Sequence, residues 1–293
     1  MMHHYISGNR LKISGVLICM MLVITIIIWY PILNTENHKT LSVSFLDVGQ
    51  GDAIFVTTPS GRQILIDGGK DNSVLHQLND VMPFWDRSID VVVATHPDAD
   101  HIGGLVEVLK RYRVATFVYS GVEQDTQENN AILSLVLEKD IYSVAARRGQ
   151  TYDFGDGVTM TILFPDREVR ELESNAASVV ARVDFGAHSF LLTGDAPKMI
   201  EEYLLSLGND QLQSTVLKAG HHGSKTSSSP LFVGFVAPEY VVMSRGCNNR
   251  YGHPHEEVIA VLNNFEITTF DTCDDGRVTF TSDGQILQIE GFD

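Results

Sequence analysis

Two histidines and two aspartates lie within six positions of the segment ATHPDADHIGG, at residues 94–104. Alternate residues of an extended segment face the same side, so His96, Asp98 and Asp100 can share a face. His101 can reach the same place where a Gly-Gly pair lets a helix begin. Carboxylates and neutral imidazoles together bind divalent transition metals. The cluster therefore predicts a metal site, because the alternative, capping of the next helix by Asp100, explains only one residue in four.

Two other apolar stretches end in groups of the same chemistry. SFLLTG leads into Asp195, and TVLKAG leads into His221 and His222. Side chains at the carboxyl ends of neighbouring strands can converge on one crevice. Three carboxylates gathered there would repel one another and raise each other's pKa unless cations were present. Two divalent cations would leave the pocket slightly positive, which suits a metal-bridging hydroxide as nucleophile.

The pattern of apolar residues predicts the elements that must position these groups. Alternating stretches over residues 41–66 are typical of an antiparallel meander. Strands and helices then alternate through residues 91–140 and again through 158–271, and a closing pair of strands follows over 277–290. Strand-rich halves flanked by helices favour an α/β (α+β) fold, specifically a four-layer αββα sandwich.

The N-terminal region predicts a membrane anchor. Residues 13–35 carry no charge, and their apolar part is long enough to cross a bilayer as a helix. A cleavable signal peptide is the alternative, but its apolar region is usually shorter and ends in a cleavage site of small residues. The predicted divisions are a tail at 1–12, a transmembrane helix at 13–33, a linker at 34–40 and a hydrolase domain at 41–293.

The flanking charges predict the orientation of this single-pass protein. Arg10 and Lys12 precede the apolar segment, whereas Glu36 and Lys39 follow it. Positive charge favours the cytoplasmic side, so the N-terminus would be cytoplasmic and the catalytic domain periplasmic or extracellular.

Charge and cysteine content limit the function classes. The net charge is −16, so the chain lacks the broad basic face of a protein that grips nucleic acid tightly. Cys247 and Cys273 are the cysteines outside the apolar segment. They would pair in an oxidising compartment, and two free thiols are the alternative.

Taken together, five motifs resemble a known family. HPDADH, with LDVGQGDA, LIDGG, TGD and LKAGHHGSKTSSS, is similar to the metallo-β-lactamase-fold hydrolases. The match is to the branch that resembles the extracellular domain of the DNA-uptake protein ComEC, and it extends over residues 41–290. The multi-span channel region of that branch has no counterpart in this sequence, where the single anchor stands instead. The resemblance implies the αββα sandwich and a hydrolytic activity.

The resemblance also implies roles for individual residues. His96 and Asp98 would bind one metal ion, Asp100, His101 and His222 would bind the second, and Asp195 would bridge them. Asp100, Asp195 and His221 would take part in catalysis. This branch has Asp98 where a histidine is commoner in the superfamily, and it has no histidine near residues 175–178. An oxygen-rich site accepts Mn²⁺ as well as Zn²⁺, so the identity of the two ions stays open.

Further residues are expected around the metal site, where each would either hold a metal ligand in place or contact the substrate: Asp67, Lys218, Ser224, Lys225, His253 and His255. Asp67 would orient ligands from behind. The cationic and hydroxyl side chains could bind a phosphate, although scattered solvated charges are the alternative. Either His221 or His222 could be the ligand, and His222 is favoured.

The predicted function is therefore that of a membrane-anchored dinuclear hydrolase, most consistent with a phosphodiesterase or nuclease. Its partner would be a phosphoester substrate, either DNA or a decorated envelope polymer. Two alternatives stand beside it: a phosphocholine-esterase-like hydrolase of envelope polymers, and a metal-bound binding module without catalysis. The sequence leaves the oligomeric state open.

Overall fold

The computed structural model describes residues 15–27, 29, 40–208 and 210–290. The chain divides into two compact units, Met1–Lys39 and Thr40–Asp293. In the first unit, residues 15–27 form a helix with exposed apolar side chains. No helix among the described residues has the length and apolar character needed to span a bilayer.

The predicted transmembrane helix at 13–33 is therefore not supported by the described part of the chain. Residues 13, 14, 28 and 30–33 of that segment lie outside the described residues. The predicted tail at 1–12 and the linker at 34–40, apart from Thr40, lie outside them as well.

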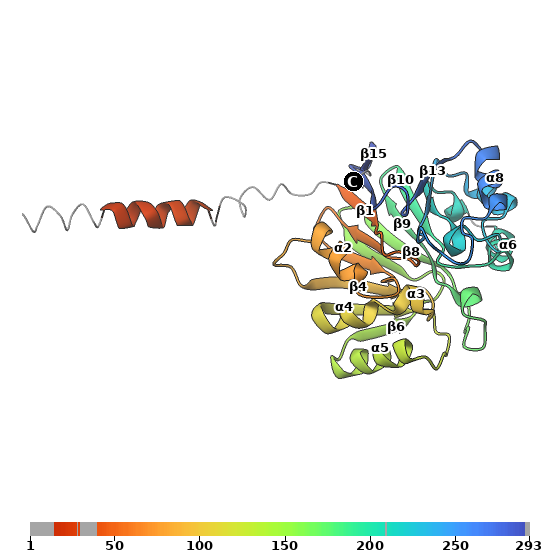
Figure 1. Ribbon diagram of the computed structural model, residues 1–293, viewed down its shortest axis with the longest axis horizontal. Coiled ribbons are helices and arrows are strands. Elements are labelled where there is room, and N and C mark those ends of the chain that lie inside the picture. The colour runs from red at the N-terminus through yellow and green to blue at the C-terminus, as the bar shows by residue number, and fades with distance from the viewer. Residues whose placement is uncertain (1–14, 28, 30–39, 209, 291–293) are drawn as a thin grey trace, which may run out of the picture. The chain divides into compact units, whose positions relative to one another are not determined.

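The second unit contains two sheets (Figure 1). The first has the order β15-β14-β1-β2-β3-β4-β5-β6. Its strands are β1 (Leu41–Phe45), β2 (Ile54–Thr57), β3 (Gln63–Ile66), β4 (Ser88–Ala94), β5 (Arg113–Tyr119), β6 (Tyr142–Ala145), β14 (Val278–Ser282) and β15 (Leu287–Glu290). Strands β1 to β3 form the predicted antiparallel meander, and β3 to β6 run parallel.

The second sheet has the order β13-β12-β11-β10-β9-β8-β7. Its strands are β7 (Thr151–Gly155), β8 (Val158–Phe164), β9 (Val180–Phe185), β10 (His188–Leu192), β11 (Val216–Lys218), β12 (Tyr240–Met243) and β13 (Thr268–Asp271). Strands β10 to β13 run parallel, so their carboxyl ends lie at one edge of the sheet.

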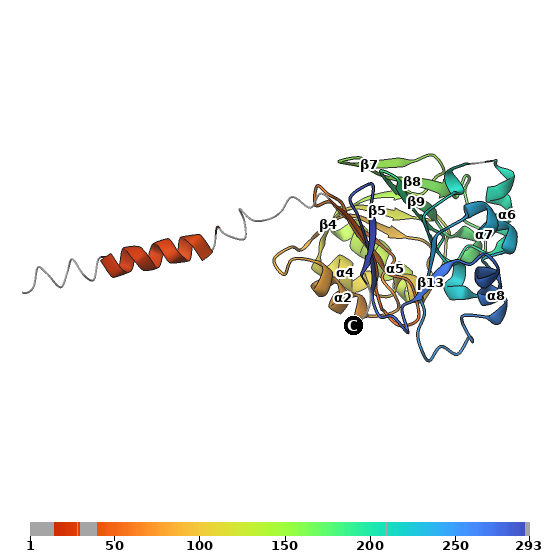
Figure 2. The ribbon, with the colours of Figure 1, turned by 90° about the horizontal axis from the view of Figure 1, so that it is seen from above.

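Helices cover the outer face of each sheet (Figure 2). The first sheet packs against α2 (Ser73–Val81), α4 (Leu105–Arg111) and α5 (Gln127–Glu138), and the second against α6 (Lys198–Ser206), α7 (Pro230–Val236) and α8 (Glu256–Asn264). The short helices are α3 (Ala99–Ile102), η1 (Asn175–Ala177), η2 (Asp210–Leu212) and η3 (Gly220–Gly223).

Three apolar cores hold these layers together. The central core lies between the sheets and includes Phe45, Phe190 and Phe280, each fully buried. The other two lie between each sheet and its helices. This arrangement confirms the predicted αββα sandwich of two sheets.

Glycines let the loops of the first sheet approach one another at the end of β4. A Cβ on Gly51 would lie 2.0 Å from the carbonyl oxygen of Asp100, and one on Gly104 would lie 2.1 Å from that of Gly68. The Gly-Gly pair thus serves close backbone packing, because any side chain there would collide with the neighbouring turn. This packing brings Asp52 and the HPDADH loop together.

Candidate metal centre

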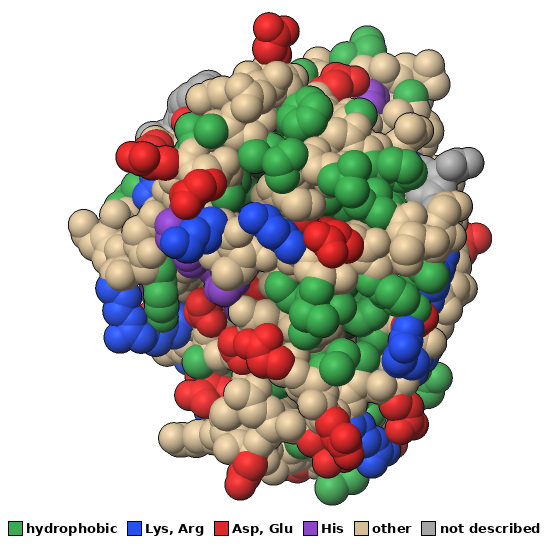
Figure 3. Space-filling view, turned by 90° about the vertical axis from the view of Figure 1, so that its right-hand side faces the viewer, with side chains coloured by type: hydrophobic (Ala, Val, Ile, Leu, Met, Phe, Trp, Pro, Cys, Tyr) green, Lys and Arg blue, Asp and Glu red, His purple; other side chains and the backbone are tan. Residues whose placement is uncertain are grey.

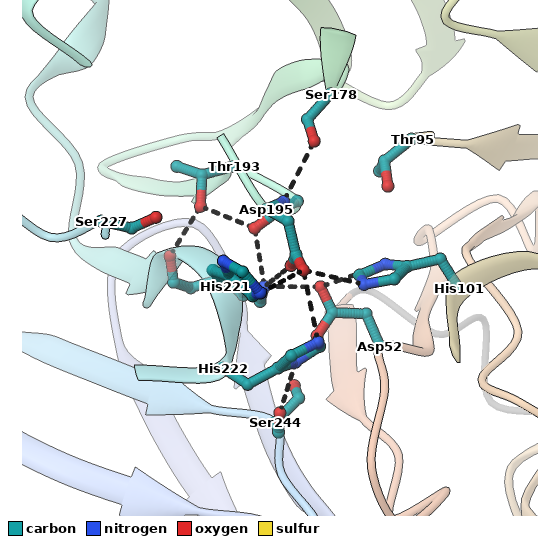
Figure 4. Close-up of polar contacts among 12 residues, drawn as sticks. Asp52, Thr95, His101, Ser178, Thr193, Asp195, His221, His222, Ser227 and Ser244 are labelled. Carbon is teal, nitrogen blue, oxygen red and sulfur yellow. Dashed lines mark hydrogen bonds and ion pairs between the residues drawn. The ribbon is translucent and has the colours of Figure 1, made fainter. Parts of the chain in front are cut away.

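Loops from both sheets meet at the candidate metal centre (Figure 4). His96 follows β4 of the first sheet, Asp195 follows β10 of the second, and His222 follows the adjacent β11. The two sheets are joined directly here, because the backbone N–H of Val179, just before β9, donates to the carbonyl oxygen of Thr95 at 2.9 Å. The predicted convergence of strand ends therefore occurs between two sheets.

Asp195 lies at the middle of this group, as Figure 4 shows. Four histidine Nε2 atoms surround its Oδ2 atom, at 3.3 Å for His101, 3.4 Å for His222, 3.6 Å for His221 and 4.0 Å for His96. Residues up to 126 positions apart thus share one carboxylate oxygen, the geometry expected of a residue that bridges two ions.

The remaining predicted ligands, Asp98 and Asp100, each lie near one of these histidines. Asp100 Oδ2 is 3.5 Å from His222 Nε2, and Asp98 Oδ2 is 3.8 Å from His96 Nε2. The six predicted metal ligands thus lie close to one another around Asp195. Which ion each residue binds stays a prediction.

Two of the histidines are oriented by hydrogen bonds through Nδ1. His101 Nδ1 lies 2.7 Å from Asp67 Oδ2, and His222 Nδ1 donates to the carbonyl oxygen of Ser244 at 2.8 Å. Such bonds are typical of metal-binding histidines, because a proton held on Nδ1 leaves the Nε2 lone pair free for a cation. This geometry favours His222 as the ligand.

His96 is held in the same way by hydroxyl groups. Thr95 Oγ1 donates to Asp67 Oδ2 at 2.6 Å, so it accepts from His96 Nδ1 at 3.0 Å. Ser178 Oγ lies 3.4 Å from the same nitrogen and accepts the backbone N–H of Asp195 at 3.2 Å. Asp67 therefore contacts His101 directly and reaches His96 through the hydroxyl of Thr95.

These contacts leave three imidazole nitrogens without a partner. The Nε2 atoms of His96, His101 and His222 are buried, and none forms a hydrogen bond within the described structure. A buried polar atom left unpaired costs about 1–3 kcal/mol. Three such lone pairs beside carboxylates are the donor set that Zn²⁺ or Mn²⁺ takes, so the residues present fit a divalent metal site.

Asp52 belongs to the same cluster, although no site role is predicted for it from the sequence. Ligand atoms of Asp52, His101, Asp195 and His222 all lie within 4.8 Å of one another. Its motif, LDVGQGDA, is among those that carry the family resemblance, but no residue of that motif is assigned a role from the sequence. The signal available was an acid placed in a glycine-rich turn between two apolar strands.

Lys218 is fully buried and lies against Asp52 and Asp195. From the sequence it is expected either to support the metal ligands or to contact the substrate. Its Nζ lies 2.6 Å from Asp52 Oδ2 and 3.5 Å from Asp195 Oδ1, and it donates to the carbonyl oxygen of Gly194 at 2.7 Å. An ammonium group has three protons, and the protein accepts all of them. Lys218 therefore acts on the centre through Asp52 and Asp195, as a supporting residue and not as a substrate contact.

The expected mutual repulsion of the acids is outweighed by neighbouring cationic groups in the metal-free protein. Burial opposes ionisation of Asp195, but His222, His101 and Lys218 outweigh it and hold the pKa of Asp195 well below its usual value. Burial also opposes ionisation of Asp100, yet the neighbouring His222 and His101 keep its pKa lowered. The case for metal ions thus depends on the unpartnered nitrogens and not on unrelieved acids.

The turn after β11 has an unusual backbone. His221 and His222 have φ values of 49° and 55°, in the left-handed region that side chains other than glycine rarely adopt. Each such residue costs about 1–3 kcal/mol and tends to occur at functional sites. This backbone directs both rings toward Asp195, and His221 remains partly exposed.

The other residues expected around the metal site lie at its exposed edge, here called the rim, or hold the neighbouring turn in place. Lys225 is exposed, and its backbone N–H donates to His255 Nδ1 at 3.2 Å. His253 is 8% exposed, with its ring centroid 5.5 Å from that of His221. Ser224 is buried and accepts from Thr226, so it shapes the turn and is not positioned to contact substrate.

Cys247 and Cys273 form a disulfide, which resolves the alternatives left open by the sequence. It joins the loop after β12 to the loop after β13. Arg245, in the first of these loops, is bonded to Asp271 and pairs with Asp274 at 3.0 Å. The guanidinium group of Arg245 therefore supports the loop.

This fold and site define a class of protein. The family model of the metallo-beta-lactamase superfamily matches residues 46–244, and the chain belongs to that superfamily. It is similar to the ComE operon protein 3 of Bacillus subtilis, with 28% identity over 291 residues that cover 94% of this chain and 36% of that protein. It is also similar to the competence protein ComA of Neisseria gonorrhoeae, with 34% identity over 227 residues, or 76% of this chain and 29% of that protein.

The resemblance to the ComEC-like competence family is thus confirmed. The chain spans about a third of the length of these curated relatives. Among solved structures it is similar to the metallo-beta-lactamase fold protein YhfI from Bacillus subtilis, with a TM-score of 0.54 and 13% identity over 86% of this chain and 99% of that one. A metallo hydrolase from Ignicoccus hospitalis gives a TM-score of 0.53 and 16% identity, over 82% and 98% of the two chains. At these identities the two structures share the fold alone.

The affinity of the metal-free protein for Mn²⁺ should rise with pH. Burial disfavours the charged form of His222, but Asp195 outweighs it and, with Asp100 and Asp52, raises the pKa to about 9. Below that pH a cation must displace the proton, so affinity should increase about tenfold per pH unit between pH 7 and pH 9 for each proton displaced. Titration with buffered Mn²⁺ at several pH values measures it, and a pH-independent affinity would contradict the role of His222 as ligand.

Proposed function

We propose that the chain is a metal-dependent phosphodiesterase that acts on nucleic acid outside the cytoplasm. The observation that carries the proposal is the set of three buried, unpartnered Nε2 atoms beside the carboxylate of Asp195. His96, Asp98 and Asp195 would hold one cation, and Asp100, His101, His222 and Asp195 the other. Two bound cations would activate the attacking water and neutralise charge on the leaving oxygen.

The protein's own residues supply orientation and proton transfer. Asp67, Thr95 and Ser244 keep the Nδ1 atoms occupied, so that the Nε2 atoms point inward. His221 is the histidine best placed to contact the substrate, because it is partly exposed and its Nε2 lies 3.6 Å from Asp195 Oδ2. The arrangement does not need a serine or cysteine nucleophile, since the nucleophile is water.

An extended phosphodiester is favoured over a small ester by the likeness to known proteins. One of the matched relatives is a competence protein by name, and from that likeness we take nucleic acid as the substrate class. The net charge of −16 favours transient contact over tight, processive binding.

We place the catalytic domain outside the cytoplasm, tethered by the apolar segment at 13–33. The disulfide between Cys247 and Cys273 supports an oxidising compartment, because such bonds are rare in the cytosol. A topology reporter fused after Asp293 tests this part of the proposal. A reporter signal from the cytoplasm would contradict it.

Hydrolysis of bis(p-nitrophenyl) phosphate tests the activity. Full-length protein stripped with a chelator should be inactive, and it should regain turnover when about two equivalents of Zn²⁺ or Mn²⁺ are returned. A phosphocholine-bearing polymer and a β-lactam serve as comparison substrates. Metal binding without turnover of any of these would favour the binding module, and cleavage of the polymer alone would favour the phosphocholine esterase.

A further inference from the structure

The loop between β12 and α8 is held rigidly at the rim of the metal centre. The disulfide of Cys247 fixes its first half. The side chain of Asn249 donates to the carbonyl oxygens of Gly246 and His253, at 2.9 and 2.7 Å, and accepts the backbone N–H of His253 at 2.9 Å. The backbone N–H of His255 donates to the carbonyl oxygen of Gly223, at 3.0 Å, which ties the loop to the turn after β11. The loop is therefore preorganised.

A row of rings leads from the surface to the centre along this loop. The Tyr251 ring is stacked on His253, with centroids 5.6 Å apart and planes 22° apart. His253 is 5.5 Å from His221, whose Nε2 reaches Asp195. Tyr251 is 49% exposed at the outer end of the row. His253 Nδ1, in contrast, is buried and has no hydrogen-bond partner in the described structure. The loop thus presents an aromatic surface beside an unsatisfied polar atom.

The same rim carries cations that no acid neutralises. The guanidinium carbon of Arg250 lies 5.1 Å from the Tyr251 ring centroid, and Arg250 donates to the hydroxyl of Tyr251 at 3.2 Å. Arg250 and Lys225 are both exposed, and neither forms an ion pair with a carboxylate in the described part of the chain. Figure 3 shows histidine side chains at the surface with Lys or Arg side chains beside them. In so acidic a protein, this spot is suited to phosphate groups.

We propose that Tyr251 and Arg250 form a stacking subsite for a nucleobase that flanks the cleaved phosphodiester of a single-stranded polynucleotide. The proposal rests on the proposed function and deepens it. Bases stack on tyrosine rings and on guanidinium planes without regard to sequence. A base paired and stacked within a duplex does not offer its face in this way, so the subsite selects unpaired strands. Lys225 would contact a neighbouring phosphate.

The chemistry of the rim favours a nucleobase over a choline group. A quaternary ammonium binds over aromatic faces that no other cation approaches. Here the guanidinium of Arg250 already lies against the Tyr251 ring and would repel a second positive charge. The polyanionic backbone of a nucleic acid is attracted by the same guanidinium.

Binding of a fluorescein-labelled oligothymidylate to the chelator-treated full-length protein tests the subsite without turnover. The matched ligand has the same backbone with abasic positions in place of the bases. We expect Tyr251→Ala to weaken binding of the oligothymidylate about 10- to 100-fold. Tyr251→Phe keeps the ring and should change binding less than about threefold. The abasic ligand should bind the wild-type and the alanine variant equally weakly.

Tyr142→Ala provides the control for loss of an exposed tyrosine. Tyr142 is 68% exposed and lies on β6 of the first sheet, whereas the loop of Tyr251 follows β12 of the second sheet. It should bind as the wild-type does. The proposal would be overturned if the wild-type protein bound the oligothymidylate and the abasic strand equally well. It would also be overturned if Tyr251→Ala bound the oligothymidylate as the wild-type does.

Failure of the subsite and failure of the proposed function give different results. Tyr251-dependent binding with no metal-dependent turnover of oligothymidylate would leave the subsite in place and refute the phosphodiesterase. Metal-dependent turnover with a kcat/KM that is the same for Tyr251→Ala and the wild-type would support the enzyme and overturn the subsite.

Discussion

Replacing Asp195 by asparagine should lower the metal-dependent turnover of bis(p-nitrophenyl) phosphate by at least about 1000-fold. Asp195 Oδ2 lies within 4.0 Å of four histidine Nε2 atoms, as expected of a carboxylate that bridges the two predicted cation sites. Asparagine keeps the shape but removes the negative charge that would hold two cations together. We therefore expect the number of tightly bound ions to fall from about two to at most one, as elemental analysis after desalting would measure.

Asp184→Asn is the matched control for this substitution. Asp184 lies on β9 of the same sheet, where its carboxylate accepts from Arg182 Nε at 2.8 Å, and it is not part of the cluster. Its variant should keep both the metal content and the turnover of the wild-type. Retention of two ions and substantial activity by Asp195→Asn, in protein whose thermal unfolding remains cooperative, would refute the bridging role.

The layers of the fold could be predicted because its strands are short and clearly bounded. Strand β1 alternates apolar and polar residues, and β2 and β3 are short apolar runs bounded by turns that contain glycine. Strand β4 ends in a continuous apolar run typical of a strand buried on both faces. Other elements gave weaker signals. Helix α7 directly follows the serine-rich stretch at 224–229, which by itself does not indicate a helix. Ser229 caps the helix, and Pro230 is its first residue. The sequence alone also does not indicate that β14 returns to pair with β1, because that contact spans most of the chain.

The ligands of the site could be predicted for two reasons. Metal ions bind only a few side-chain types, and here those side chains directly follow apolar strands. The residues that orient those ligands could not be predicted, since Thr95, Ser178 and Ser244 are common side chains with no spacing that marks them. The role of Lys218 could not be predicted from the sequence either. A lysine at a strand end is usually solvated, and only the fold reveals that this one is buried between two acids.

That burial makes Lys218 the second test of large effect, now on stability. In metal-free protein, Lys218→Met should reduce the free energy of unfolding by about 3–5 kcal/mol, because it leaves Asp52 buried without its cation. Burial opposes ionisation of Asp52, and Lys218 is the largest influence that keeps its pKa low. Unfolding by urea in the presence of a chelator measures the change. Lys198→Met, at the half-exposed start of α6, is the control and should cost less than about 1 kcal/mol.

The double variant Asp52→Asn with Lys218→Met separates loss of the charge pair from loss of packing. If the cost of Lys218→Met comes from an uncompensated carboxylate, removing that charge should restore at least about 2 kcal/mol. Asp52→Asn alone should cost less than Lys218→Met alone, because the ammonium keeps Asp195 at 3.5 Å and the carbonyl oxygen of Gly194 at 2.7 Å as partners. Additive costs for the two substitutions would mean that the pair is not coupled, and Lys218 would then be a packing residue without an electrostatic influence on the metal centre.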